Sequence, residues 1–171
     1  KPAKPAMAKG KKILIIAGVV AAVLALAGYG FGSYYYSRGQ VAERYEAAAK
    51  KSFKDSLEYQ VWSDTKKEIK TSEVKYTDTK STQAYSKSQL MSGERMQKVG
   101  RQFLIFPKWR VVVGPGTVDL TVNTADLNVT INGVSYATTD GNNYTAKLNH
   151  LYPGTYNFVA SGKVNDQDIT V

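Results

Sequence analysis

The stretch ILIIAGVVAAVLALAGYGF, residues 13–31, contains nineteen residues and no charged side chain. An α-helix of this length covers about 28 Å, close to the roughly 30 Å hydrocarbon thickness of a bilayer. Tyr34, Tyr35 and Tyr36 follow it, and tyrosine rings are typical of the membrane interface. The sequence therefore predicts a single transmembrane helix over residues 13–36.

The flanks of this helix predict its orientation. Residues 1–12 carry five lysines and no acidic residue. Because basic flanks stay on the cytoplasmic side, we expect residues 1–12 to be a basic cytoplasmic tail and the chain beyond residue 36 to be extracellular. The predicted localisation is the plasma membrane, with a single span, a cytoplasmic amino end and an extracellular carboxyl end. Membrane lipid is then an expected partner.

A cleavable secretory signal is the alternative interpretation of the same stretch. A lysine-rich start, an apolar core and the small residues Ala25 and Ala27 before Gly28 fit such a signal, with cleavage between Ala27 and Gly28. The anchor is favoured because the apolar run continues past this site. Tyrosines and a helix-like segment also follow the run.

Composition and charge narrow the class of protein. The chain has 171 residues and no cysteine, which excludes disulfides, thiolate nucleophiles and zinc–thiolate sites within it. Residues 38–110 hold sixteen basic and nine acidic residues, whereas residues 111–171 hold two basic and five acidic ones. A basic module beside a membrane indicates attraction to anionic lipid or wall polymer, with a solvated mixed-charge surface as the alternative. Nucleic acid is not expected, because no nucleic-acid motif is present.

Residues 37–113 are predicted to form an extracellular α+β juxtamembrane module. Apolar residues recur every four positions from Val41 to Leu57, which indicates a helix that buries one stripe. Further along, short helices on a weak core are expected to start near Thr71 and Thr82, with partial disorder as the alternative.

A β-hairpin is predicted at the end of this module. Residues 96–99 and 102–106 are expected to be its strands, joined by a turn at residues 100–101. The sequence FLIF in the second strand indicates a buried or half-buried strand. Pro107 is expected to end that strand, and a further strand is expected to begin at Trp109.

Residues 114–171 are predicted to form a small all-β, sandwich-like domain. The sequence Gly-Pro-Gly at 114–116 marks its start. Polar and apolar residues alternate in VDLTVNT and LNVTIN, which is the pattern of strands with one buried face. Asn132-Gly133 predicts a tight hairpin turn, and residues 140–143 predict a second turn. Short strands at about ten-residue spacing are typical of a β-sandwich.

The order of these segments resembles a known family. A lysine-rich tail, one membrane span and a helical segment precede VGRQFLIFPKWRVVV (99–113) and LNVTINGVSYATTDGNNYTAKLNHLYPGTYNFVA (127–160). This arrangement, over about residues 11–160, is similar to the TcaA family of Gram-positive membrane proteins, named for association with teicoplanin susceptibility. Members typically carry a cytoplasmic zinc ribbon, which the absence of cysteine excludes from this chain, and several extracellular domains, of which the chain to Val171 spans only the first part.

No pattern in the sequence predicts an enzyme, a metal site or a cofactor. The chain has no G-x-S-x-G sequence, no P-loop and no dinucleotide fingerprint. Its single histidine, His150, is expected to be a loop or edge residue. Aromatic rings near turns are the candidate binding residues, because exposed rings are platforms for sugars and peptides, with packing in the core or turns as the alternative. These candidates are Trp109, Tyr136, Tyr144 and Tyr152.

Two functions follow as hypotheses. The first is a single-pass cell-envelope protein whose extracellular domains bind or sense cell-wall polymers, wall precursors or glycopeptides, as the resemblance implies. The second is a non-catalytic spacer or assembly partner that holds other envelope proteins or domains at a set height above the membrane.

Overall fold

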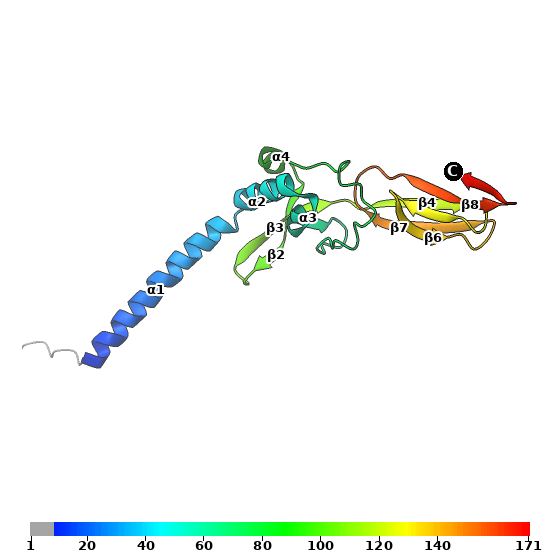
Figure 1. The fold of residues 1–171 in the computed structure, drawn as a ribbon. Coiled ribbons are helices and arrows are strands. Elements are labelled where there is room, and N and C mark those ends of the chain that lie inside the picture. The colour runs from blue at the N-terminus through cyan, green and yellow to red at the C-terminus, as the bar shows by residue number, and fades with distance from the viewer. Residues whose placement is uncertain (1–8) are drawn as a thin grey trace, which may run out of the picture.

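The computed structural model describes residues 9–171, so most of the predicted cytoplasmic tail (1–12) lies outside the described residues. The chain is elongated (Figure 1). A long helix forms one end, a mixed α/β body follows it, and a body built from strands forms the other end. We call the middle body the proximal module and the last one the distal module.

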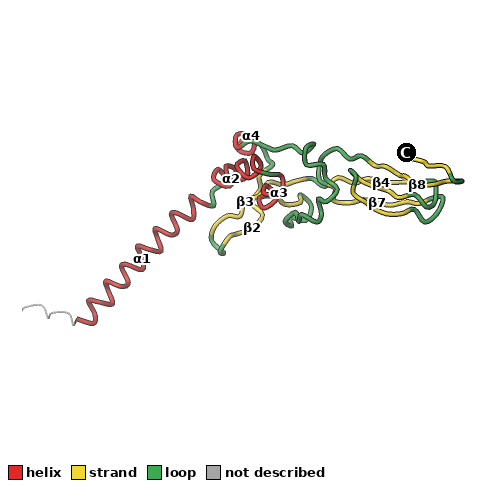
Figure 2. The backbone as a smooth tube through the Cα atoms, viewed as in Figure 1, coloured by secondary structure: helices red, strands yellow, loops and turns green. Residues whose placement is uncertain are grey.

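Helices are confined to the first two parts of the described chain (Figure 2). The helices are α1 (Lys9–Tyr35), α2 (Arg38–Lys51), α3 (Phe53–Ser56) and α4 (Lys87–Ser92), with a 3-10 turn η1 (Leu57–Tyr59). The strands of the proximal module are β1 (Gln60–Trp62), β2 (Met96–Gln102) and β3 (Phe106–Val113). Those of the distal module are β4 (Gly116–Val122), β5 (Asn128–Ile131), β6 (Val134–Thr138), β7 (Tyr144–Leu151), β8 (Phe158–Val164) and β9 (Gln167–Thr170).

Helix α1 has 27 residues, which gives it a length of about 40 Å. It is long and apolar enough to cross a membrane, a property that anchors and secretory signals share. Nearly all of its side chains are exposed, and only Gly32 is buried. Within residues 9–171, the large apolar surface of α1 therefore has no protein partner along most of its length.

The predicted helix from Val41 to Leu57 is divided into shorter pieces. Ser37 caps α2, and Ser52 adopts an extended conformation that ends α2 and caps α3. The hydroxyl of Ser52 accepts a hydrogen bond from the Asp55 amide at 3.0 Å. Serine competes with the helix backbone for hydrogen bonds, which explains why the regular apolar pattern did not produce one continuous helix.

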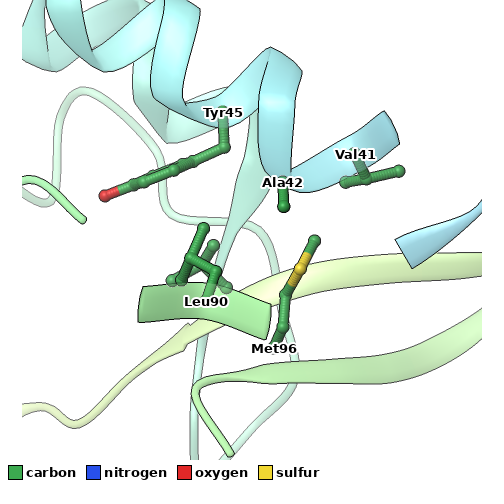
Figure 3. Close-up of a cluster of buried hydrophobic side chains, with 6 residues drawn as sticks. Val41, Ala42, Tyr45, Leu90 and Met96 are labelled. Carbon is green, nitrogen blue, oxygen red and sulfur yellow. The ribbon is translucent and has the colours of Figure 1, made fainter. Parts of the chain in front are cut away.

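The core of the proximal module lies between α2, α4 and the sheet (Figure 3). Tyr45 of α2 and Leu90 of α4 are 1% and 0% exposed, and they meet Met96 of β2 and Val111 of β3. The sheet has the order β1-β3-β2, with β1 parallel to β3 and β2 antiparallel to it. The core of the proximal module is thus formed by residues that are far apart in the sequence.

The β2–β3 hairpin differs from the prediction. Strand β2 continues through Gly100 and Arg101, and the turn consists of Phe103, Leu104 and Ile105. Pro107 lies within β3, opposite Arg101, instead of ending a strand. The hairpin itself is present, but the predicted turn at 100–101 is wrong. Of the predicted strand FLIF, only Phe106 is buried and belongs to a strand, and the other three residues form an exposed turn.

The segment 63–92 contains one helix, α4, which begins after Ser86 in a capping box. The helix starts predicted near Thr71 and Thr82 are wrong, because turns and extended backbone occupy those positions. The segment contacts the distal module instead. The Tyr76 carbonyl accepts a hydrogen bond from Asn132 at 2.8 Å, and Ser81 accepts one from the Thr155 amide at 3.0 Å.

The distal module consists of two sheets, β4-β7 and β6-β5-β8-β9, with all neighbouring strands antiparallel. The hairpin predicted at Asn132-Gly133 is confirmed: both residues have positive φ, as the turn between β5 and β6 requires. Both sheets contribute to one small buried cluster, formed by Ile131, Leu148 and Leu151. Residues 116–170 thus form strands and no helix, as the sequence predicts.

Candidate functional site

An apolar hollow lies in the distal module, at a distance from α1 along the chain. It is a half-open groove of about 320 Å³ between β4 of one sheet and β5 and β8 of the other. We call it the intersheet groove. Its lining residues are Leu120, Thr121, Val122, Asn123, Thr124, Leu127, Val129, Phe158, Val159, Ala160 and Val171.

The groove is open because the smaller sheet has only two strands. Strand β4 pairs with β7 on one side, and no strand of the described residues 9–171 pairs with its other side. Val118, Leu120 and Val122 alternate with exposed residues along β4, and all three are half-buried. An unpaired strand edge beside an apolar groove can accept an extended peptide, which adds main-chain hydrogen bonds and places side chains in the groove.

The rim of the groove is held by a buried threonine. Thr139 is 1% exposed, and its hydroxyl donates to the Thr124 carbonyl at 2.7 Å and accepts from the Leu127 amide at 2.9 Å. These bonds fix the loop between β4 and β5, and they satisfy both sides of the hydroxyl. The groove entrance is therefore positioned before any ligand arrives, which reduces the entropy cost of binding.

The chemistry of the groove favours binding through shape and apolar contact. Its lining contains apolar side chains, two threonines and one asparagine, and no histidine, acidic or basic residue. Ligand sites commonly combine such an apolar lining with a few polar groups and have volumes of about 300–1,000 Å³. The described residues contain no group of three histidine or acidic side chains that could hold a metal ion.

Two of the predicted binding residues lie on the distal module outside this groove. Tyr136 of β6 is half-buried, and its ring contacts Tyr76 edge to face with centroids 5.8 Å apart. Burial, together with the neighbouring Tyr144, raises the pKa of the Tyr136 phenol. Tyr144 begins β7 opposite Val122, the last residue of β4. Tyr136 therefore partly covers the distal core, and Tyr144 lies near it.

The other two predicted binding residues, Trp109 and Tyr152, pack against buried side chains. Trp109 is half-buried against the proximal core, with the Arg38 guanidinium 5.8 Å from its ring centroid. Tyr152 is 4% exposed, and its hydroxyl donates to Oε1 of the Gln60 side chain at 2.7 Å. Burial raises the pKa of the Tyr152 phenol. The burial of Tyr152 removes its ring from any surface ligand and speaks against the predicted binding role.

Tyr152 instead joins the two modules. It comes from the distal part of the chain but packs against Trp62 and Phe53 of the proximal module. Beside it, the His150 Nε2 lies 2.9 Å from the Asp64 carboxylate, with the imidazole 5.4 Å from the Trp62 ring. No local pattern in the sequence connects these two positions, which are 86 residues apart, so the pair is visible only in the structure.

Comparisons with known proteins do not assign this chain to a family. No protein-family model, no curated protein and no solved structure matches it.

Proposed function

We propose that this chain is a single-pass cell-envelope protein whose distal module binds an extended apolar or peptide segment of an envelope component. Helix α1 spans the membrane with its amino end in the cytoplasm, and the two modules lie outside. The two sheets of the distal module act as a sandwich-like body that is open along β4. The ligand class that fits the sequence resemblance to the TcaA family is the peptide part of a wall precursor or a glycopeptide.

The observation that supports this proposal is the intersheet groove. It combines an apolar lining, a fixed rim and a free strand edge at the end of the molecule away from α1. A cell-wall ligand lies some distance from the bilayer, so a site at the outer end meets it without crowding by lipid. The basic residues of the proximal module add attraction to anionic wall polymers, which salt weakens.

The test uses the full chain in lipid nanodiscs. Binding of purified wall precursor peptide, a glycopeptide and wall teichoic acid is measured by calorimetry at low and high salt. We expect saturable binding of a peptide-containing ligand that persists at high salt. Binding of teichoic acid alone, lost at high salt, would contradict a specific site in the groove.

A matched pair of variants connects binding to the groove. Val122→Lys places a charge in the apolar lining and is expected to abolish salt-resistant binding. Thr117→Lys adds the same charge at an exposed position of β4, outside the lining, and is expected to bind normally. Equal loss in both variants would contradict the proposal. A mature amino terminus at Gly28 would contradict the membrane anchor.

A rigid spacer is the second candidate, favoured by the packed junction between the modules. Tyr152, Trp62 and Gln60 are each at most 4% exposed. Hydrogen bonds that Asn132 and Thr155 of the distal module donate to residues 76–81 add to the junction. A chain whose only role is spacing would bind none of the ligands above, and it would tolerate Val122→Lys without loss of function in cells.

A further inference from the structure

The turn of the β2–β3 hairpin exposes three consecutive large apolar side chains. Phe103 is 70% exposed, Leu104 87% and Ile105 55%. Single exposed apolar residues are ordinary, but a contiguous apolar group at a loop tip marks a contact surface. We call Phe103, Leu104 and Ile105 the hairpin tip.

The hairpin lies against the carboxyl-terminal end of α1. Phe106, the first residue after the tip, contacts Gly32, and its ring centroid lies 5.8 Å from that of Tyr29 and 5.3 Å from that of Tyr36. The Phe103 ring is also 6.1 Å from Tyr36. Gly32 has no side chain, and this allows the close approach of Phe106.

These contacts place the hairpin at a defined depth. If residues 13–31 fill the hydrocarbon core, Tyr29 and Gly32 lie at its outer boundary. Phe106 contacts both residues, so the hairpin tip next to it is at the level where acyl chains meet headgroups. Aromatic residues are typical of that level, and Tyr34, Tyr35 and Tyr36 of the same chain directly follow the apolar run.

The side chains beyond the tip have the charge that a headgroup layer favours. Arg101 and Lys98 of β2 are exposed. A polar hollow of about 200 Å³ begins at Gln102 and Pro107, the neighbours of the tip. Its lining includes Arg44, Lys108, Arg110 and Glu58, together with tyrosine and tryptophan rings. From the tip of the hairpin toward the proximal core, apolar side chains therefore come first, and basic and aromatic side chains follow. From the inside of a leaflet toward water, acyl chains likewise come first and anionic headgroups follow.

We propose that the hairpin tip inserts into the outer leaflet beside α1 and is a second membrane contact of this chain. The occupant of the apolar surface is lipid, because the surface is continuous with the lipid-facing surface of α1. The inference rests on the proposed membrane span of α1 and goes beyond it. Two contacts at different positions restrain the tilt of the proximal module relative to the bilayer, which one helix alone does not.

The absence of cysteine makes the test direct. A single cysteine is introduced at Leu104 in the full chain, labelled with a nitroxide and reconstituted into vesicles of phosphatidylglycerol and phosphatidylcholine. Power-saturation spectroscopy then compares the accessibility of the label to oxygen, which concentrates in the bilayer, and to a water-soluble nickel chelate. We expect an oxygen-to-nickel ratio several-fold higher for Leu104→Cys than for Val134→Cys, an exposed site on the distal module.

Controls separate this inference from the membrane span itself. Val23→Cys, at an exposed site in the middle of α1, reports whether the helix is in the bilayer. A bilayer-like ratio at Val23 with a water-like ratio at Leu104 would overturn the hairpin insertion and leave the span intact. A water-like ratio at both sites would overturn both proposals. Because the vesicles contain no other protein, a tip that docks only on a protein partner gives a water-like ratio and also overturns the proposal.

A second variant tests the role of the neighbouring side chain. Phe103→Asp in the Leu104→Cys chain is expected to lower the oxygen-to-nickel ratio to that of Val134→Cys, because burying the carboxylate in the leaflet is unfavourable. The same change in the Val23→Cys chain is expected to leave the ratio unchanged. An unchanged ratio at Leu104 would contradict the proposed insertion.

Discussion

The proximal and distal modules differ in how completely they bury their apolar side chains. In the proximal module, Ala42, Leu90 and Val111 are completely buried between helices and sheet. In the distal module, most residues of β4 and β8 are only half-buried, and the two sheets leave a groove between them. A closed core and an open groove between sheets are thus found in different modules. The closed core of the proximal module resists deformation, whereas the distal module leaves apolar side chains accessible between its two sheets.

Shortening Leu90 is the change with the largest expected effect. Leu90→Ala leaves a cavity in the closed core and is expected to lower the free energy of unfolding by about 2–5 kcal/mol. Val122→Ala, in the open groove, removes partly solvated methyl groups and is expected to cost about 1 kcal/mol or less. Urea unfolding of the full chain in detergent micelles, followed by circular dichroism, measures both. Equal losses would show that the two modules do not differ in packing.

The junction provides the next test. Tyr152→Phe removes the donor to Gln60, whose side chain is buried, and leaves its carbonyl oxygen without this bond. An unsatisfied buried acceptor costs about 1–3 kcal/mol. We expect the two modules to unfold at more widely separated urea concentrations in this variant. As a control, Tyr144→Phe alters a less buried phenol away from the junction and is expected to leave the separation unchanged.

The turn of the β5–β6 hairpin tests the distal module alone. Gly133 has a φ of 77°, a conformation that costs an L-residue about 1–2 kcal/mol. Gly133→Ala is expected to destabilise the distal module by that amount while the proximal transition stays in place. Gly141→Ala is the matched control, because no heavy atom lies within 4 Å of the added methyl group and the backbone there does not have positive φ. A similar loss at both positions would contradict the role of the turn.

The smallest expected effect is a dependence on pH in the proximal module. The Lys50 ammonium, 2.7 Å away, and the Lys87 amide lower the pKa of the Glu46 carboxyl group below its ordinary value. The stabilisation is therefore complete above the ordinary pKa and is lost as the pH falls through the lowered value. Glu46→Gln is expected to flatten the decline of the urea midpoint below about pH 4.5. Glu94→Gln, an exposed change in the same module, is expected to leave the decline as it is.

The sequence predicts the parts of the fold that depend on local pattern. The apolar helix, the strands of the distal module and the Asn132-Gly133 turn follow from composition, alternation and backbone preference. The residues FLIF show the limit of this approach. An apolar run indicates removal from water, but it does not say whether protein or another apolar medium surrounds it. The run therefore predicts a strand where the structure has the exposed turn at Leu104.

The candidate site depended on contacts that no local pattern contains. The intersheet groove joins residues of β4 to residues of β8, and it exists because β7 pairs with β4 instead of with β6. Aromatic residues near turns predict a binding surface, because exposed rings are platforms for ligands. Tyr152 fills the junction instead, since its ring meets Trp62 from a distant part of the chain.

The parallel pairing of β1 with β3 has a consequence for the order of events during synthesis. Gln60 lies beside Val111, fifty-one positions later in the chain, so until β3 has been made β1 has only its local bridge between Val61 and Glu68. Pairing across such a separation is slow, because a long loop must close first. A nascent chain that has been synthesised past α2 but not yet to Val113 therefore carries an incomplete proximal module. The pairing of β1 with β3, which completes the sheet, comes late in folding.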